Sequence, residues 1–540
     1  MKDISSTGSF INFYLNNYIY VDKTQYIRDL IKLERVFISR PRRFGKSLTL
    51  DTIATLFETG VEPYFKGTWI YDKWTEPTYP VLRLNFLDLD KYSLEHFKQK
   101  LNAIISSFAR DINVKNYEEK VEPEDTIYFL LDELRKEKRQ IVILIDEYDC
   151  QMTANINNET LYKQFQEKIK SFYATIKNKW PIKFLGITGV TRLKDVEIFS
   201  IGSDIRDITN ASAYSQMIGF TRDEIKKYYI DYLKLASSYE NSCSVDNVTD
   251  EQIESLLDRL AKNYDGYCFD EDYEKKVFST WSVNKFFQTM VGKKKVQFGE
   301  YWYDNGGLPS ILVNYLKTHE LNIFEYLDKD KFLKVSSDDF KNPTALTTIN
   351  QNVLMCQTGY LTLRSDLNKT STVALGIPNG EIYKALNRLL ANNIFKGNTD
   401  ITDDYGRSLL EVGTVDDIIN LFNSALNSVS YDNYPIVSES SVQNMLKLYL
   451  LGAHQEVLSE VHEAKGRADL VVNTDNKRIV FEFKYAKNET EAKTKLSEAV
   501  EQIKTQDYGN ILPKKAELIR IAAVFNADPK VRAFTEYQEV

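Results

Sequence analysis

The sequence predicts an α/β protein in three parts: a parallel-sheet domain over residues 1–220, a mostly helical domain over 221–390, and a compact α/β/α unit over 391–540. Three observations predict this organisation. Short apolar runs alternate with helical patterns in the first part, which is typical of a parallel sheet. Helical periodicity dominates the second part, and in the third a helix leads into two apolar strands and a final helix.

Length and composition agree with several packed domains. A chain of 540 residues corresponds to three or four domains at about 150 residues each. The chain is 43% hydrophobic and has 34 Tyr and 29 Phe, which indicates large cores rather than disorder. Its net charge of −8 counts against a dedicated nucleic-acid binder, which is usually basic, but allows a local basic cleft.

Cysteine and histidine usage limits the chemistry. The four cysteines are far apart and form no CxxC motif, so we expect free thiols in a reducing cytosol. The four histidines are scattered, so any metal site must be built from carboxylates. The N-terminus has no apolar signal region, and the longest apolar runs are far shorter than the roughly 20 residues of a membrane span. We therefore expect a cytoplasmic protein without a membrane partner.

Four apolar segments of the first part are the expected strands. They cover residues 36–38, 81–86, 141–145 and 184–190. The third is apolar throughout, as a central parallel strand should be. Leu50, Ile53, Ala54 and Phe57 have helical spacing directly after the first strand.

A phosphate-binding motif lies between that first strand and its helix. The segment from Arg40 to Ser47 ends in Gly-Lys-Ser, as a P-loop does in this context. Gly45 would allow close approach of the backbone to phosphate, Lys46 would reach the β- and γ-phosphates, and Ser47 would ligate Mg²⁺. The helix N-terminus adds amide donors and a positive dipole end.

The motif departs from a standard P-loop at its first position, where Arg40 stands instead of glycine. Its neighbouring arginines add positive charge where an anion would bind. We expect ATP to contact the following residues of this loop: Arg42, Arg43, Phe44, Gly45, Lys46 and Ser47.

The third strand supplies the second half of the expected nucleotide site. It ends in Asp146 and Glu147, the arrangement of a Walker B motif. Asp146 would hold Mg²⁺, directly or through water, and Glu147 would polarise the attacking water. On the fourth strand, Thr188 is the candidate for sensing the γ-phosphate. Arg192 is a candidate for stabilising transferred phosphate charge, although a surface role is an equally good interpretation.

These motifs together resemble the AAA-ATPase-like family of bacterial proteins, which often carry a C-terminal PD-(D/E)xK domain. The resemblance rests on segments that occur in the expected order, and a loop that begins with arginine is usual in this family. It covers nearly the whole chain and implies ATP and Mg²⁺ as cofactors. The segments are residues 20–24, 40–47, 145–149, 188–192, 198–200, 207–209, 264–267, 301–302 and 377–379.

The C-terminal part contains a candidate nuclease site. Asp469 lies thirteen residues before Glu482, which leaves room for a hairpin. On a strand, Glu482 and Lys484 project to the same face, because side chains alternate. The two carboxylates would hold Mg²⁺ or Mn²⁺, and Lys484 would help to activate water and stabilise the charged transition state.

This pattern resembles the PD-(D/E)xK core, a restriction-endonuclease-like α/β/α fold. The resemblance implies a catalytic role for Gln502 on the following helix, and an extra metal ligand at Glu439. The expected partners are ATP and nucleic acid, with DNA versus RNA and self-assembly into a homo-oligomer left open.

Two functions remain open at this point. The first is an ATP-controlled, metal-dependent nuclease in which nucleotide turnover moves the helical part and controls access to the cleavage site. The second is a regulatory, signal-transducing ATPase whose C-terminal domain binds nucleic acid or protein without cleaving it. The acidic composition fits the second somewhat better.

Overall fold

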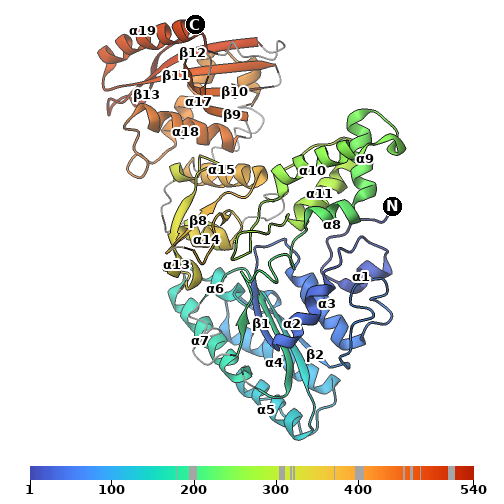
Figure 1. Cartoon of the computed structure of the whole chain (residues 1–540). Coiled ribbons are helices and arrows are strands. Elements are labelled where there is room, and N and C mark those ends of the chain that lie inside the picture. The colour runs from blue at the N-terminus through green and yellow to red at the C-terminus, as the bar shows by residue number, and fades with distance from the viewer. Residues whose placement is uncertain are drawn as a thin grey trace. The chain divides into compact units, whose positions relative to one another are not determined.

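The structure is a computed structural model of the whole chain (Figure 1). The expectation for residues 198–200 falls outside the described residues. Within the described residues, no helix is long and apolar enough to cross a membrane. The described residues are 1–177, 179–193, 204–302, 310–316, 319, 323–343, 345–369, 371–395, 407–453, 456–462, 466–474, 476–508 and 517–540.

Two compact units make up the chain. The first comprises Met1–His319 and Phe332–Ile382, and the second comprises Glu320–Lys331 and Tyr383–Val540. The predicted domain division at residue 220 stays a prediction.

A five-stranded sheet forms the centre of the first unit. Its strand order is β2-β3-β4-β1-β5, and every neighbouring pair is parallel. The four strands predicted from apolar runs are confirmed, and β5 is an additional short edge strand. The bounds are β1 Arg35–Ser39, β2 Val81–Asn85, β3 Ile141–Asp146, β4 Ile182–Gly189 and β5 Arg206–Asp207.

Helices connect and cover these strands (Figure 1). The predicted helix after β1 is confirmed as α3, which begins directly after Gly45 and packs over β3. Gly45 has a φ of 105°, a left-handed conformation that favours glycine. The bounds of the α-helices in this region are α1 Phe10–Leu15, α2 Thr24–Leu30, α3 Lys46–Thr59, α4 Leu94–Asp111, α5 Pro123–Lys136, α6 Cys150–Ala154 and α7 Glu159–Ile176.

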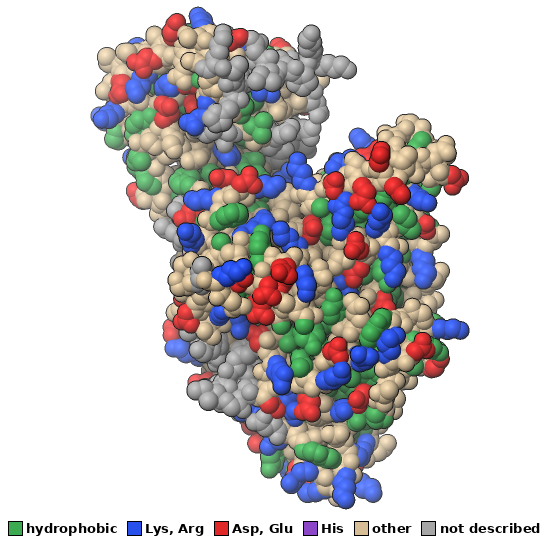
Figure 2. Space-filling model, viewed as in Figure 1, with side chains coloured by type: hydrophobic (Ala, Val, Ile, Leu, Met, Phe, Trp, Pro, Cys, Tyr) green, Lys and Arg blue, Asp and Glu red, His purple; other side chains and the backbone are tan. Residues whose placement is uncertain are grey.

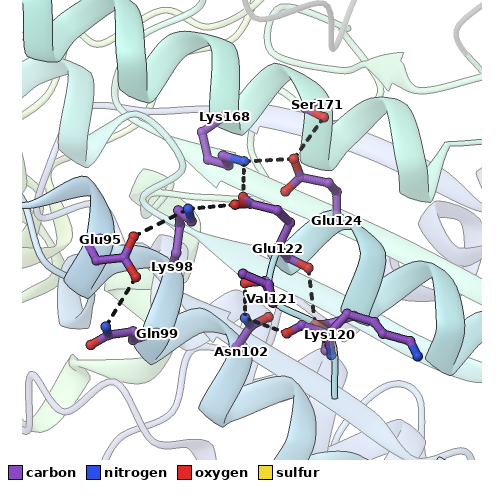
Figure 3. Close-up of polar contacts among 11 residues, drawn as sticks. Glu95, Lys98, Gln99, Asn102, Lys120, Val121, Glu122, Glu124, Lys168 and Ser171 are labelled. Carbon is purple, nitrogen blue, oxygen red and sulfur yellow. Dashed lines mark hydrogen bonds and ion pairs between the residues drawn. The ribbon is translucent and has the colours of Figure 1, made fainter. Parts of the chain in front are cut away.

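A charge network joins α4, α5 and α7 at the start of α5 (Figure 3). Glu122 accepts hydrogen bonds from Lys98 and Lys168, and Lys168 also pairs with Glu124 at 2.8 Å. Hydrogen bonds from Lys168 and Lys98 hold the pKa of Glu122 below its usual range. The Asn102 amide donates to the carbonyls of residues 120 and 121, which fixes the loop that leads into α5. The network orients three helices, although partly exposed ion pairs each contribute only about 0–1 kcal/mol.

The middle of the chain is helical, as predicted, with one addition. The first helical stretch of this part forms two helices rather than one, because helical geometry is interrupted at Tyr229. A small antiparallel sheet of order β6-β8-β7 was not predicted; its strands are two to five residues long, too short for a clear period. The bounds are α8 Arg222–Tyr228, α9 Ile230–Asn241, α10 Asp250–Tyr264, α11 Thr280–Lys293, α12 Ser310–Leu316, β6 Leu333–Ser336, α13 Ser337–Lys341, α14 Gln351–Gln357, β7 Thr362–Leu363, β8 Thr372–Gly376 and α15 Gly380–Ile394.

The second unit is a mixed sheet with helices on both sides (Figure 1). Its strand order is β13-β12-β11-β10-β9; β11 and β12 are parallel, and the other pairs are antiparallel. Helix α19 lies on one side, and α17 and α18 lie on the other. The bounds are α16 Arg407–Val412, α17 Val415–Asn427, α18 Glu439–Gly452, β9 Glu456–His462, β10 Arg467–Asn473, β11 Lys477–Ala486, α19 Glu489–Gln506, β12 Glu517–Asn526 and β13 Ala533–Glu539.

Close packing at the end of β4 gives a test of the first unit. A Cβ at Gly189 would overlap the Tyr148 ring and lie 2.8 Å from an Asp149 oxygen. We expect Gly189→Ala to lower the free energy of unfolding by about 1–3 kcal/mol, as overpacking does, measured by thermal denaturation. Gly292→Ala in α11 is the control, because a Cβ there meets nothing within 4 Å. Equal melting temperatures for the two variants would contradict the packing argument.

Candidate functional site

A cavity of about 340 Å³ opens beside the N-terminus of α3. This volume lies within the range of about 300–1,000 Å³ that is usual for ligand pockets. Five stretches of the first unit contribute most of its wall: residues 5–8, 19–23, 42–49, 217–220 and 280–284. The 42–49 stretch supplies every loop residue predicted to contact ATP, and Glu147 also lines the cavity.

Lys46 is one of the residues that line this cavity, and it is almost fully buried. Its ammonium donates to the carbonyl oxygens of Arg40 at 3.0 Å and Pro41 at 3.3 Å, and lies 3.4 Å from Glu147 Oε1. Its charge is therefore stabilised by its own loop and by one carboxylate. An anionic ligand in the cavity would compete for the same ammonium group.

Asp146 joins the loop to the sheet. Its carboxylate accepts a hydrogen bond from Ser47 Oγ at 2.5 Å and another from the Thr188 hydroxyl. The predicted Ser47 and Asp146 pair is thus in contact. Neither Asp146 nor Thr188 lines the cavity; the Thr188 hydroxyl contacts Asp146, which in turn contacts Ser47 of the cavity wall.

The turn after β3 directs Glu147 toward the cavity. Glu147 has a φ of 52°, and the buried Asp149 fixes the turn against the end of β4. The Asp149 carboxylate accepts hydrogen bonds from the Thr191 amide at 2.7 Å and hydroxyl at 2.5 Å, and from the Val190 amide at 3.3 Å. Burial, and then the charge of Glu147, raises the pKa of Asp149.

Arg40, at the position of the missing glycine, serves the fold. Its side chain is 1% exposed and donates to the carbonyls of Ser39 at 2.9 Å and Thr209 at 2.6 Å. The guanidinium also lies 4.2 Å from the centre of the Phe269 ring. Burial lowers its pKa to about 9. The arginine holds the loop against the β5 region and is not among the residues that line the cavity.

Arg43 and Phe44 are held by the middle of the chain. Arg43 Nη1 donates to the carbonyls of Tyr301 at 2.7 Å and Trp302 at 2.9 Å, and the guanidinium lies 4.8 Å from the Trp281 ring centre. The Phe44 ring packs edge-on against Trp302 at 6.1 Å and against a second aromatic ring at 4.7 Å. The predicted contact residues therefore also connect the loop to the helical region.

Arg192 lies away from the cavity. Its side chain pairs with Asp207 of β5, and it lines a separate cavity of about 40 Å³. Its predicted role toward phosphate stays a prediction.

Sequence reasoning missed the far walls of the cavity. Lys23, within the 20–24 motif, lies there with 12% of its side chain exposed and pairs with Glu224 at 2.6 Å. Burial lowers its pKa, against the opposing effect of Glu224. Asn284 of α11 donates to the Ser5 carbonyl at 3.2 Å and so holds the N-terminal segment at the cavity. The one available signal was that Lys23 lies in the 20–24 segment, which resembles the AAA-ATPase-like family; it indicated no role for the residue.

The second unit brings the three predicted nuclease residues together. The antiparallel register pairs Leu470 with Phe481, so the next pair outward is Asp469 with Glu482. Asp469 Oδ2 accepts a hydrogen bond from the Phe483 amide at 2.8 Å, and Lys484 Nζ lies 2.6 Å from Glu482 Oε1. Burial, and then the charge of Asp469, raises the pKa of Glu482 to about 7.

Helices on both sides contribute to this site. Glu439 at the start of α18 lies 3.5 Å from Lys484, and Gln443 donates to the Asp469 carbonyl at 2.5 Å. Gln502 of α19 donates to the Tyr508 hydroxyl at 3.1 Å rather than to a carboxylate. Gln443 was not predicted, since a buried glutamine on a helix carries no pattern of its own.

The donor set fits a divalent cation held by few protein ligands. Glu482 is 1% exposed, and its Oε2 has no hydrogen-bond partner within the described part of the chain. No group of three or more His, Cys, Asp or Glu side chains there has metal-binding geometry. Mg²⁺ commonly takes one or two carboxylates and completes its shell with water and phosphate oxygens. The orphaned oxygen beside Asp469 meets that requirement.

Comparisons with known proteins agree with these two sites. Residues 5–199 match the family described as Predicted AAA-ATPase, and residues 437–535 match the PD-(D/E)XK nuclease superfamily. The chain therefore contains an AAA-ATPase-like domain and a C-terminal domain of the PD-(D/E)XK nuclease superfamily. The expectation drawn from the motifs is confirmed.

One relative is similar over nearly the whole chain. It is the "Uncharacterized protein in vnfD 5'region" of Azotobacter chroococcum mcd 1, which is 26% identical over 533 residues, 95% of this chain and 94% of that protein.

Two solved structures were also matched. Cdc6p from Pyrobaculum aerophilum is 11% identical, covers 68% of this chain and 93% of its own, and has a TM-score of 0.24. The Aeropyrum pernix ORC1 protein in complex with DNA is 10% identical, covers 71% and 97%, and has a TM-score of 0.28.

The role of Arg40 can be tested by restoring the glycine. We expect Arg40→Gly to lower the free energy of unfolding by about 1–3 kcal/mol, because the Thr209 and Ser39 carbonyls lose their donor. Thermal denaturation measures the change. Arg42→Ala is the control, since Arg42 is a half-buried arginine of the same loop. A gain in stability for Arg40→Gly would show that the arginine is not a structural anchor.

Proposed function

We propose that the chain binds and hydrolyses ATP in its first unit and cleaves nucleic acid with a divalent metal in its second. The observation that carries the nuclease proposal is the buried, unpartnered Glu482 Oε2 beside Asp469 and Lys484. The AAA-ATPase-like family match and the cavity around Lys46 support the ATPase proposal.

In the ATP site, the 40–47 loop is proposed to act as a P-loop. Lys46 would leave the carbonyls of its own loop for the β- and γ-phosphates, and Arg43 would add positive charge at the cavity wall. Ser47 and Asp146 would hold Mg²⁺, which screens the phosphate charge when bound. Glu147 would orient the water that attacks the γ-phosphorus, with ADP and phosphate as products.

In the nuclease site, Asp469 and Glu482 are the proposed ligands of Mg²⁺ or Mn²⁺, which would polarise the scissile phosphate when bound. Lys484 would stabilise the developing charge on the phosphate and help to orient the attacking water. Gln443 would hold the backbone of Asp469, and Gln502 would hold Tyr508 at the edge of the site. Glu439, beside Lys484, would take part only if the cation shell extends that far.

The alternative is a regulatory ATPase that binds nucleic acid or protein without cleavage. The acidic composition favours it: the net charge is −8, and the face in Figure 2 mixes Lys and Arg with Asp and Glu. Cleavage assays on plasmid, single-stranded DNA and RNA, with and without ATP, distinguish the two functions.

The ATP site is tested by a pair of variants. We expect Lys46→Ala to lose most ATP affinity, because the phosphates lose their central cation. We expect Glu147→Gln to keep ATP binding and to lose turnover, because water loses the carboxylate that orients it. Isothermal titration calorimetry and phosphate release measure the two effects. Full affinity in Lys46→Ala would place ATP elsewhere, and full turnover in Glu147→Gln would exclude this carboxylate as the catalytic group.

The nuclease site is tested by removing each group in turn. We expect Asp469→Asn and Glu482→Gln to abolish metal-dependent cleavage, because each removes a ligand of one ion. Lys484→Ala should slow cleavage by about 10²–10³-fold, by analogy with loss of an oxyanion donor, while Mn²⁺ still binds. Glu498→Gln, on the exposed face of α19, is the control. Cleavage that survives both carboxylate changes would point to a contaminating nuclease.

A further inference from the structure

Glu381 is a buried carboxylate with no part in either proposed reaction. It lies in the first turn of α15 and is 2% exposed. Its Oε1 accepts a hydrogen bond from the Trp302 amide at 2.8 Å, and its Oε2 lies 2.7 Å from Ser282 Oγ. Among the described residues, no lysine, arginine or histidine forms an ion pair with it. Ionising a buried carboxyl group without a cation is costly, so the position of Glu381 requires a reason.

Both partners of Glu381 lead to the same loop residue. The carbonyls of Tyr301 and Trp302 accept hydrogen bonds from Arg43 Nη1 at 2.7 and 2.9 Å. Ser282 lies in the first turn of α11, where the Thr280 hydroxyl donates to the Arg43 carbonyl at 2.9 Å. One carboxylate therefore supports the contacts of both the side chain and the backbone of Arg43.

The packing around the 301–302 turn leaves Arg43 and its contacts little freedom to move. Gly359 has a φ of 90°, and a Cβ there would lie 2.8 Å from the Trp302 ring and 2.9 Å from Pro41 Cβ. The Trp281 indole donates to the Tyr301 carbonyl at 3.1 Å. The loop and the 301–302 turn are thus pressed together, and Arg43 has few positions available.

We propose that Glu381 is a positioning residue for the nucleotide site: through Trp302 and Tyr301 it holds Arg43 at the wall of the cavity where the phosphates would bind. This inference rests on the proposed ATP function and deepens it. It gives a role toward the phosphate loop to a residue that closely follows the 377–379 segment, which the motifs singled out.

The protonation state of Glu381 provides a readout. Burial raises its pKa to about 8, so the carboxyl is mostly neutral at pH 7. The titratable groups that face it are Glu300, Tyr264 and Tyr267. Ionisation as the pH rises through about 8 would put an uncompensated charge in this core and disturb the 301–302 turn. ATP affinity should therefore fall above this pH in the wild type.

A double-mutant cycle tests the inference. ATP affinity is measured by calorimetry with Mg²⁺ for the wild type, Glu381→Ala, Arg43→Ala and the double variant. We expect each single change to weaken binding about tenfold, and the double variant to bind no more weakly than Arg43→Ala, since both remove one interaction. Glu381→Gln should rescue binding at pH 7 and remove the fall above pH 8. Met290→Ala, in the same core, controls for loss of stability alone.

Three results would overturn the inference. Glu381→Ala could bind ATP as tightly as the wild type, or the loss of affinity in the double variant could equal the product of the two single losses. The third is that Glu381→Gln and the wild type show the same pH profile of ATP affinity. If Glu381→Ala does not fold, the Glu381→Gln pH profile still decides. Failure of the proposed ATP function is distinguishable, because Lys46→Ala would then bind ATP as tightly as the wild type. Weak binding by Lys46→Ala with normal binding by Glu381→Ala rejects only the positioning role.

Discussion

The cost of burying charge governs the first unit. Arg40, Lys46 and Asp149 are all nearly inaccessible to solvent, and each is held by hydrogen bonds rather than by a close opposite charge alone. A buried ion without partners would cost several kcal/mol, so backbone carbonyls and amides must converge on each group. Those backbone groups belong to strand ends and turns, and satisfying the charges fixes the geometry of the loop.

The position of these groups at strand ends and turns also explains how much of the proposed ATP site could be predicted from the sequence. The loop from Arg40 to Ser47 and the pair Asp146 and Glu147 were predictable, because each follows an apolar strand and the ends of parallel strands meet at one edge. Thr188 was correctly placed on the neighbouring strand, but its hydroxyl bonds Asp146. The cavity walls near residues 5–8, 217–220 and 280–284 depend on tertiary packing, which leaves no local period in the sequence.

In the second unit, alternation along β11 was enough to predict that Glu482 and Lys484 share a face while Phe481 and Phe483 pack into the core on the other. The hairpin with β10 then brings in Asp469. Strands β9, β12 and β13 were not predicted, nor was the contact of Gln443 with Asp469. Those features come from strand order and helix docking, which single-sequence periodicity does not encode.

The arrangement of charge around Glu482 is unfavourable by itself. Two carboxylates approach one another in the centre of a sheet and share a single lysine, and one oxygen of Glu482 lacks any partner in the described chain. An apolar residue of similar size would pack at this position without that cost. A fold that retains such a group gains from it only when a cation or a charged substrate supplies the missing interaction. The cost of burying this carboxylate oxygen without a partner therefore supports a metal-dependent function over a purely structural one.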